Sequence, residues 1–125
     1  MNEERREQLI LAPGEYSFAS LIWENEPLGS GELIEIAREK LGWKKSTSYT
    51  VLRRLIEKGL FINTNSIVTS LVSQEEVISA EGKGLLERLF SGSLPAFVAH
   101  FAKKEELSEK ELRELKQLID ELEEK

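Results

Sequence analysis

A group of polar side chains between Lys45 and Arg53 is the part of this sequence best suited to bind a ligand. A helix over Lys45–Lys58 with an apolar stripe would carry them on its opposite face, and they are Lys45, Ser46, Tyr49, Thr50 and Arg53. Arg suits the edge of a guanine, and Lys suits a phosphate. Because no acid lies between Lys40 and Glu57, this face predicts DNA contact, although a helix face that only keeps the domain soluble would have a similar composition.

The other reactive side chains form no catalytic pattern. The chain has one histidine, His100, and no cysteine, which argues against a metal cluster and a thiol nucleophile. Its serines lack a neighbouring His and acid, and Gly82–Gly84 is too short for a phosphate loop, so we expect a loop or a weak helix break there. The sequence therefore predicts no enzyme, no metal and no cofactor.

Charge is unevenly distributed along the 125 residues, whose formal net charge is −6. Residues 38–58 hold seven basic and two acidic side chains, whereas residues 105–125 hold nine acidic and four basic ones. A net acidic chain would by itself argue against nucleic acid, but a local basic segment reverses that argument. With no signal peptide pattern and no apolar run of about 18 residues, we expect a cytoplasmic protein without membrane insertion.

Hydrophobic spacing predicts three helices and a hairpin in the first part of the chain. The helices fit Tyr16–Trp23 behind Pro13, Leu33–Leu41 ending at Gly42, and Lys45–Lys58 ending at Gly59. Two apolar runs, Leu60–Ile62 and Ile67–Val72, flank the turn formers Asn63–Ser66. This order is typical of a winged helix-turn-helix domain, which we assign to residues 1–73, with Trp43 expected in its core.

Residues 74–125 are predicted to be helical, with Ser73 and Ser108 as helix caps. Their apolar stripes exceed what a small domain with its own core can bury, which predicts a helical dimerisation region. The predicted fold class is therefore mainly α with a small β-hairpin: a winged helix-turn-helix domain followed by this helical region. We expect a homodimer whose interface uses Leu86, Leu89, Phe90, Leu94, Phe97, Val98, Phe101, Leu112, Leu115, Ile119 and Leu122.

Several segments resemble the penicillinase-repressor family. They are Leu11–Trp23, Thr47–Gly59, Leu71–Glu76, Leu89–Leu94 and Val98–Phe101, in the family's order. The resemblance implies a homodimeric repressor that binds a palindromic DNA operator and is relieved when a membrane sensor protease cleaves its dimerisation region. The matching bond here is Gly84–Leu85 instead of the family's usual Asn-Phe, and the absent cysteines argue against copper sensing.

The basic helix and the resemblance together predict the roles of individual residues. Ser46, Tyr49, Thr50 and Arg53 would read bases, and Lys44, Lys45, Thr47 and Arg54 would bind phosphates. Lys44 stands where the family often has a capping Ser, and the turn at Asn63–Ser66 lacks the family's basic residue. A competing hypothesis is a winged-helix module that binds a protein and has lost DNA binding.

Overall fold

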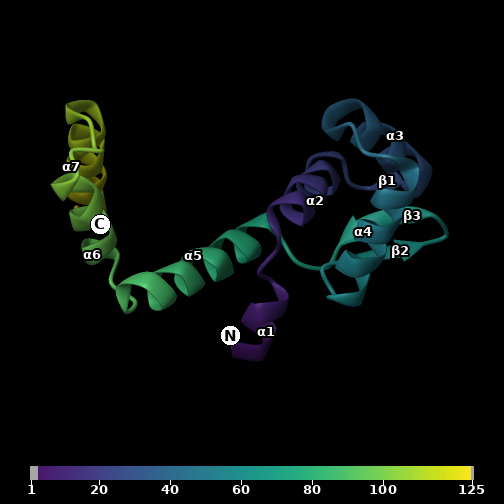
Figure 1. Cartoon of the computed structure of the whole chain (residues 1–125), viewed down its shortest axis with the longest axis horizontal. Helices are drawn as coiled ribbons and strands as arrows, with labels where there is room; N and C mark the ends of the chain where they lie inside the picture. Colours follow the sequence, from purple (N-terminus) through teal and green to yellow (C-terminus); the bar gives the residue numbers. More distant parts are fainter. Residues whose placement is uncertain (1–2, 125) are drawn as a thin grey trace. The chain divides into compact units, whose positions relative to one another are not determined.

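The computed structural model describes residues 3–124 and contains seven helices and three short strands in that range. In chain order they are α1 (Glu3–Gln8), α2 (Pro13–Asn25), β1 (Leu28–Gly29), α3 (Ser30–Leu41), α4 (Lys45–Glu57), β2 (Phe61–Thr64), β3 (Ile67–Ser70), α5 (Gln74–Phe90), α6 (Leu94–Lys103) and α7 (Glu109–Glu123) (Figure 1). The contacts within the chain divide it into two units, each described by itself. The first unit ends at Gly84, and the second unit begins at Leu85.

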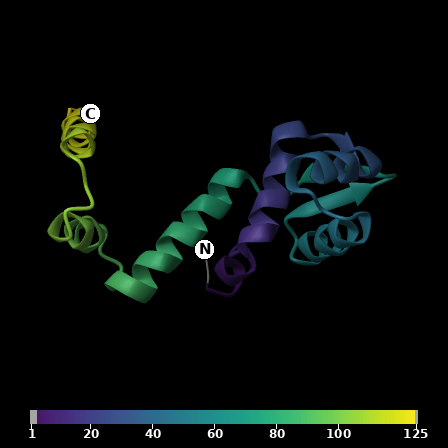
Figure 2. The same ribbon diagram turned by 45° about the horizontal axis from the view of Figure 1, so that its top comes forward.

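Three helices of the first unit confirm the predicted helix-turn-helix. α2 begins at Pro13, a residue that suits the first helical turn. α3 ends at its C-cap Gly42, and α4 ends at Glu57, with Gly59 directly after its C-cap Lys58; both glycines have positive φ. The structure adds α1, which the spacing did not predict. Figure 2 shows α2, α3 and α4 gathered beside the small sheet.

The sheet has three antiparallel strands in the order β1-β3-β2, so the predicted hairpin gains a strand. β1 was missed because Pro27, Gly29 and Ser30 indicate a turn. The turn between β2 and β3 is shorter than predicted: Asn63 and Thr64 belong to β2, and only Asn65 and Ser66 take positive φ angles, 51° and 65°. This is the pattern of a two-residue hairpin turn.

The hydrophobic core lies entirely within the first unit. Every buried hydrophobic side chain among residues 3–124 falls between Leu9 and Ala80, including Phe18, Leu33 and Phe61. Val77 and Ala80 extend this core onto α5. The first turns of α5, which follow residue 73, therefore pack against the core of the winged-helix unit. The division of function between residues 1–73 and 74–125 stays a prediction.

Helix α5 is continuous through Gly82–Gly84, so the predicted loop or weak break is wrong there. The packing of Val77 and Ala80 on the core holds α5 through two glycines, each of which costs about 1 kcal/mol relative to Ala. In the second unit, α6 and α7 follow, and Ser108 forms the predicted capping box with Glu111. Ser73 likewise accepts a hydrogen bond from the Glu76 N–H, at 3.1 Å.

Candidate nucleic-acid interface

The predicted DNA-contacting residues lie around the outer side of α4. Lys44, Lys45, Ser46, Thr47, Tyr49, Arg53 and Arg54 are exposed, and Thr50 is half-buried. The opposite side of the helix buries Val51, Leu52 and Leu55 in the core. Since a helix repeats every 3.6 residues, burying this stripe forces the polar side chains outward.

The N-terminus of α4 leaves backbone donors available. Its N-cap residue is Lys44, which makes no side-chain capping hydrogen bond, and the first helical bond runs from the Ser48 N–H to the Lys44 carbonyl. Lys44 therefore caps α4 less well than a Ser, Thr, Asp or Asn would. Uncapped N–H groups together with the helix dipole attract anions, and two lysine side chains stand beside them.

Some of the predicted base-reading and phosphate-binding residues share one hollow. It has a volume of about 240 Å³ and is lined by Ser46, Thr47, Thr50, Val51 and Arg54. The Thr50 hydroxyl donates to the Ser46 carbonyl at 2.9 Å, so it is left to accept a hydrogen bond from a ligand. Tyr49 and Arg53 are outside this hollow, which separates them from the other candidate base readers.

Two contacts hold α4 in place. Trp43 stacks on Phe18 with ring centroids 5.4 Å apart and planes at 4°, which confirms its predicted place in the core. At the other end of α4, Lys58 Nζ lies 2.9 Å from Glu15 Oε1, joining the C-cap of α4 to the start of α2. The exposed face thus has a rigid support at both ends.

Glu15 is a buried carboxylate that sequence reasoning missed. Burial raises its pKa, but hydrogen bonds from the Ala12 N–H and the Lys58 ammonium, with the attraction of Lys58 and Arg54, outweigh burial and leave the pKa below its ordinary value. The partners Glu15 and Lys58 are 43 residues apart. No local spacing indicates a pair so distant in sequence.

Ser48 is the exception on the buried side of α4. It is fully buried, and its hydroxyl has no hydrogen-bond partner among the described residues. A buried donor without a partner costs about 1–3 kcal/mol.

The wing formed by β2 and β3 has no charged side chain. The pairs Ile62 with Thr69 and Thr64 with Ile67 lie opposite each other and share one face, and both isoleucines are exposed. Ser70 is fixed to the end of α2, because its N–H and hydroxyl donate to the Glu26 carboxylate at 2.8 Å. The wing is therefore firmly attached but offers no cation for a phosphate.

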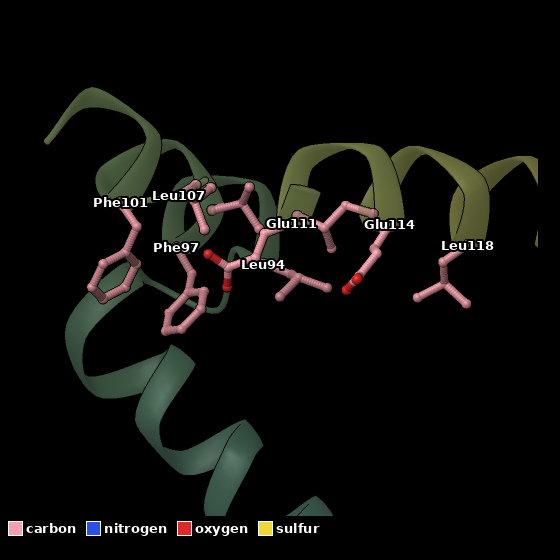
Figure 3. A pocket seen from close by; sticks show the side chains of 9 residues that line it. Leu94, Phe97, Phe101, Leu107, Glu111, Glu114 and Leu118 are labelled. Carbon is pink, nitrogen blue, oxygen red and sulfur yellow. The ribbon is translucent and has the colours of Figure 1, made fainter. Parts of the chain in front are cut away.

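The predicted dimerisation residues on α6 and α7, in the second unit, fall into two groups. Leu94, Phe97, Val98, Phe101 and Leu115 line a groove of about 440 Å³ between α6 and α7, together with Leu107, Leu118, Glu111 and Glu114 (Figure 3). Leu112, Ile119 and Leu122 are exposed outside the groove. Leu107 and Leu118 were missed because they fall outside the predicted stripes.

The remaining predicted dimerisation residues lie at the end of α5. Leu86 and Phe90 are half-buried and Leu89 is exposed. The Phe90 ring contacts Phe97 edge-on, with centroids 5.4 Å apart, and His100, with centroids 5.8 Å apart, so His100 belongs to an aromatic cluster. Gly84 and Leu85, the predicted cleavage region, lie inside α5.

Residues 3–124 contain no group of three or more metal-ligating side chains and no helix long and apolar enough to cross a membrane. A sequence profile described as penicillinase repressor matches residues 11–121. The chain belongs to the penicillinase repressor family. Members of this family are transcriptional regulators and not enzymes.

Named members of the penicillinase repressor family match nearly the whole chain. The penicillinase repressor of Bacillus licheniformis is 25% identical over 115 residues, covering 89% of this chain and 90% of its own. The methicillin resistance regulatory protein MecI of Staphylococcus aureus is 27% identical, covering 88% and 93%. The S. aureus penicillinase repressor is 23% identical, covering 94% and 97%.

Proposed function

We propose that this chain is a transcriptional repressor that binds a palindromic double-stranded DNA operator as a homodimer, with α4 as its recognition helix. The observation that carries the proposal is the outer face of α4, where Lys44, Lys45 and Arg53 are exposed. Within residues 3–124 these three cations have no ion pair or side-chain hydrogen bond. Cations without an internal partner, placed beside an uncapped helix N-terminus, fit the phosphates and base edges of DNA.

The homodimer is supported by the second unit. None of residues 85–124 is buried, although α6 is mostly apolar and α7 carries a leucine seam. A second copy would cover these faces, and the two recognition helices would then be related by a two-fold axis, which matches the symmetry of a palindromic operator.

Relief of repression by a sensor protease at Gly84–Leu85 is part of the same proposal. A cut at this bond would separate the winged-helix unit from the second unit and so end dimeric binding. Because the bond lies inside α5, a protease would first have to unwind that helix locally. Mass spectrometry of the repressor recovered from induced cells would locate the cut, and intact repressor on induction would exclude proteolytic relief.

Selection of bound sequences from a random DNA pool, followed by substitution of Arg53, tests DNA binding. We expect Arg53→Ala to weaken operator binding by about 1–3 kcal/mol and to relax the preference at one base position. The matched control is Arg38→Ala, because Arg38 is exposed on α3 and is paired with Glu35 at 2.7 Å. Unchanged affinity and selectivity in Arg53→Ala would remove Arg53 from the interface.

A salt titration tests the predicted phosphate contacts. Lys45→Ala should lower affinity similarly for all sequences and reduce the slope of log affinity against log salt by about 1. A wild-type affinity that is independent of salt would contradict binding through phosphates.

The second candidate function is a module that binds a protein partner. The uncharged wing with its exposed Ile62 and Ile67, together with the net charge of −6, favours it. Failure of the random pool to yield any enriched duplex at low salt would favour this function over DNA binding.

A further inference from the structure

The groove between α6 and α7 combines apolar walls with two acidic side chains and has no basic residue in its lining. Its half-buried side chains are all apolar, and Glu111 and Glu114 are among its exposed ones. Its volume of about 440 Å³ is typical of small-molecule sites, which are mostly apolar with a few polar groups. The groove therefore has the size and the lining of a binding site, and all of it belongs to the second unit.

Two phenylalanine rings give the groove an aromatic wall. The ring centroids of Phe97 and Phe101 are 5.0 Å apart, and Phe90 supports Phe97 by an edge-on contact at the end of α5. Figure 3 shows both groove rings and the Glu111 carboxylate pointing to the same side of the two helices. Because the faces of aromatic rings are electron-rich, this wall favours a positively charged ligand over a negatively charged one.

The two carboxylates of the groove keep oxygens for a ligand. Both hydrogen bonds that Glu111 accepts from Ser108 end on Oε1, at 3.1 and 3.3 Å, so neither uses Oε2. Glu114 Oε1 lies 3.9 Å from Lys110 Nζ, but both of these side chains are largely exposed, and an exposed ion pair of this kind contributes little. The groove therefore stays electrostatically negative.

This lining selects one class of ligand. Two carboxylates beside apolar walls are too few oxygen ligands for a metal ion, and residues 3–124 hold no group of three or more metal-ligating side chains. A neutral ligand would cover the carboxylates without pairing them, which costs free energy, and an anion would be repelled. An organic cation with a bulky apolar body can cover the rings and place its charge beside the carboxylates.

We propose that the groove binds a lipophilic organic cation, and that this ligand takes the place of the second copy of the chain. The side chains that it would cover include Phe97, Phe101 and Leu115, which are also predicted dimerisation residues. A ligand that binds only the uncovered groove shifts the equilibrium toward monomers by mass action. Binding itself depends on the groove alone, whereas its effect on DNA rests on the proposed function: a monomer contacts one operator half-site, so the cation would relieve repression without cleavage.

Two ions of nearly the same shape and opposite charge test the ligand class. Isothermal titration calorimetry of the full chain would compare tetraphenylphosphonium, a cation, with tetraphenylborate, an anion. We expect the phosphonium to bind at least about tenfold more tightly, because the carboxylates and the aromatic wall both favour its charge. Equal affinities, tighter binding of the borate, or no measurable binding of the phosphonium would overturn the proposal.

Matched substitutions on α7 locate the site. The groove variant, Glu111→Gln with Glu114→Gln, should bind the phosphonium at least about fivefold more weakly, and a glutamine at position 111 still provides the capping acceptor for Ser108. The control variant, Glu109→Gln with Glu123→Gln, removes two exposed acids of the same helix outside the groove and should keep the wild-type affinity. Unchanged affinity in the groove variant, or an equal loss in both variants, would overturn the site.

Sedimentation and operator binding test the link to assembly. Saturating phosphonium should raise the dissociation constant of the wild-type dimer at least about tenfold and weaken operator binding, with a smaller effect on the groove variant at the same concentration. A wild-type dimer that is unaffected would overturn the competition with the second copy. An equal loss of operator binding in the groove variant would overturn the effect on DNA through the groove.

The outcomes separate this inference from the proposed function. A wild type that binds the phosphonium but no duplex would overturn the proposed function and support the ligand site. A wild type that binds its operator but not the phosphonium would overturn the ligand site alone.

Discussion

The two units of this chain differ in how far their apolar side chains are buried. The winged-helix unit encloses Phe18, Leu33, Leu55 and Phe61 almost completely. In the second unit, the groove residues Leu94 and Leu118 are 58% and 51% exposed. A core that is closed within one chain stabilises that chain alone, whereas open apolar faces are stabilised only by association.

This difference indicates how the chain divides its tasks. The closed unit can present α4 in a fixed geometry without a partner, as the support from Trp43 and the Glu15–Lys58 pair suggests. On the proposed homodimer, the open unit is stabilised when a second copy covers its apolar faces. Stability in the first unit and assembly in the second should therefore respond to different substitutions.

Dividing the chain should have the largest effect. We expect a fragment of residues 1–84 to fold as a monomer, and the full chain to form a dimer at micromolar concentration, both measured by analytical ultracentrifugation. A fragment of residues 1–73 should be less stable than 1–84, by about 1.5–3 kcal/mol for the lost burial of Val77 alone. A monomeric full chain would contradict the comparison between the units.

Matched Phe substitutions should come next in size. Phe18→Ala should lower the free energy of unfolding by about 3–5 kcal/mol at every protein concentration, because it opens a cavity in a closed core. Phe97→Ala should mainly weaken dimerisation, so its effect on the thermal midpoint should depend on protein concentration. Equal, concentration-independent losses in both variants would show that the second unit is stable by itself.

The buried ion pair of the first unit should give a pH-dependent effect. Because the folded-state pKa of Glu15 is lowered, its carboxylate stabilises the fold above the ordinary Glu pKa, and this contribution is lost as the pH falls through the lowered value. Glu15→Gln should cost about 1.5–3 kcal/mol at neutral pH and progressively less in acid, followed by chemical denaturation. The exposed Glu24→Gln on the same helix is the control, and an equal pH dependence in both variants would contradict the assignment.

The smallest expected effect is at two serines with a left-handed backbone conformation, one in each unit. Ser66 at the wing turn has a φ of 65°, and Ser91 after α5 has a φ of 50°. Ser66→Gly should raise the free energy of unfolding by about 1 kcal/mol regardless of concentration, since Gly adopts this conformation without steric cost. Ser91→Gly should affect only the concentration-dependent transition. Differential scanning calorimetry at two protein concentrations would measure both transitions. A concentration-dependent effect of Ser66→Gly, or a concentration-independent effect of Ser91→Gly, would contradict this expectation.

Much of the fold could be predicted from local patterns. Local patterns predicted the helix ends near Gly42 and Gly59 and the capping box at Ser108. Each of these features depends on residues only a few positions apart in the sequence. β1 could not be predicted, because two residues become a strand only when β3 lies beside them. The continuous α5 was missed for a related reason, since the glycine penalty is local while the packing that overcomes it is not.

The candidate interface shows the same limit. The sequence by itself determined the division of α4 into a buried stripe and a polar face, because the helical repeat assigns each residue to a side. Only the tertiary structure decided that Lys58 pairs with Glu15, that Leu11 binds Glu81, and that Leu118 joins the groove. Those contacts depend on the distance between segments far apart in the chain or on the angle between helices, and no spacing within a single helix specifies either.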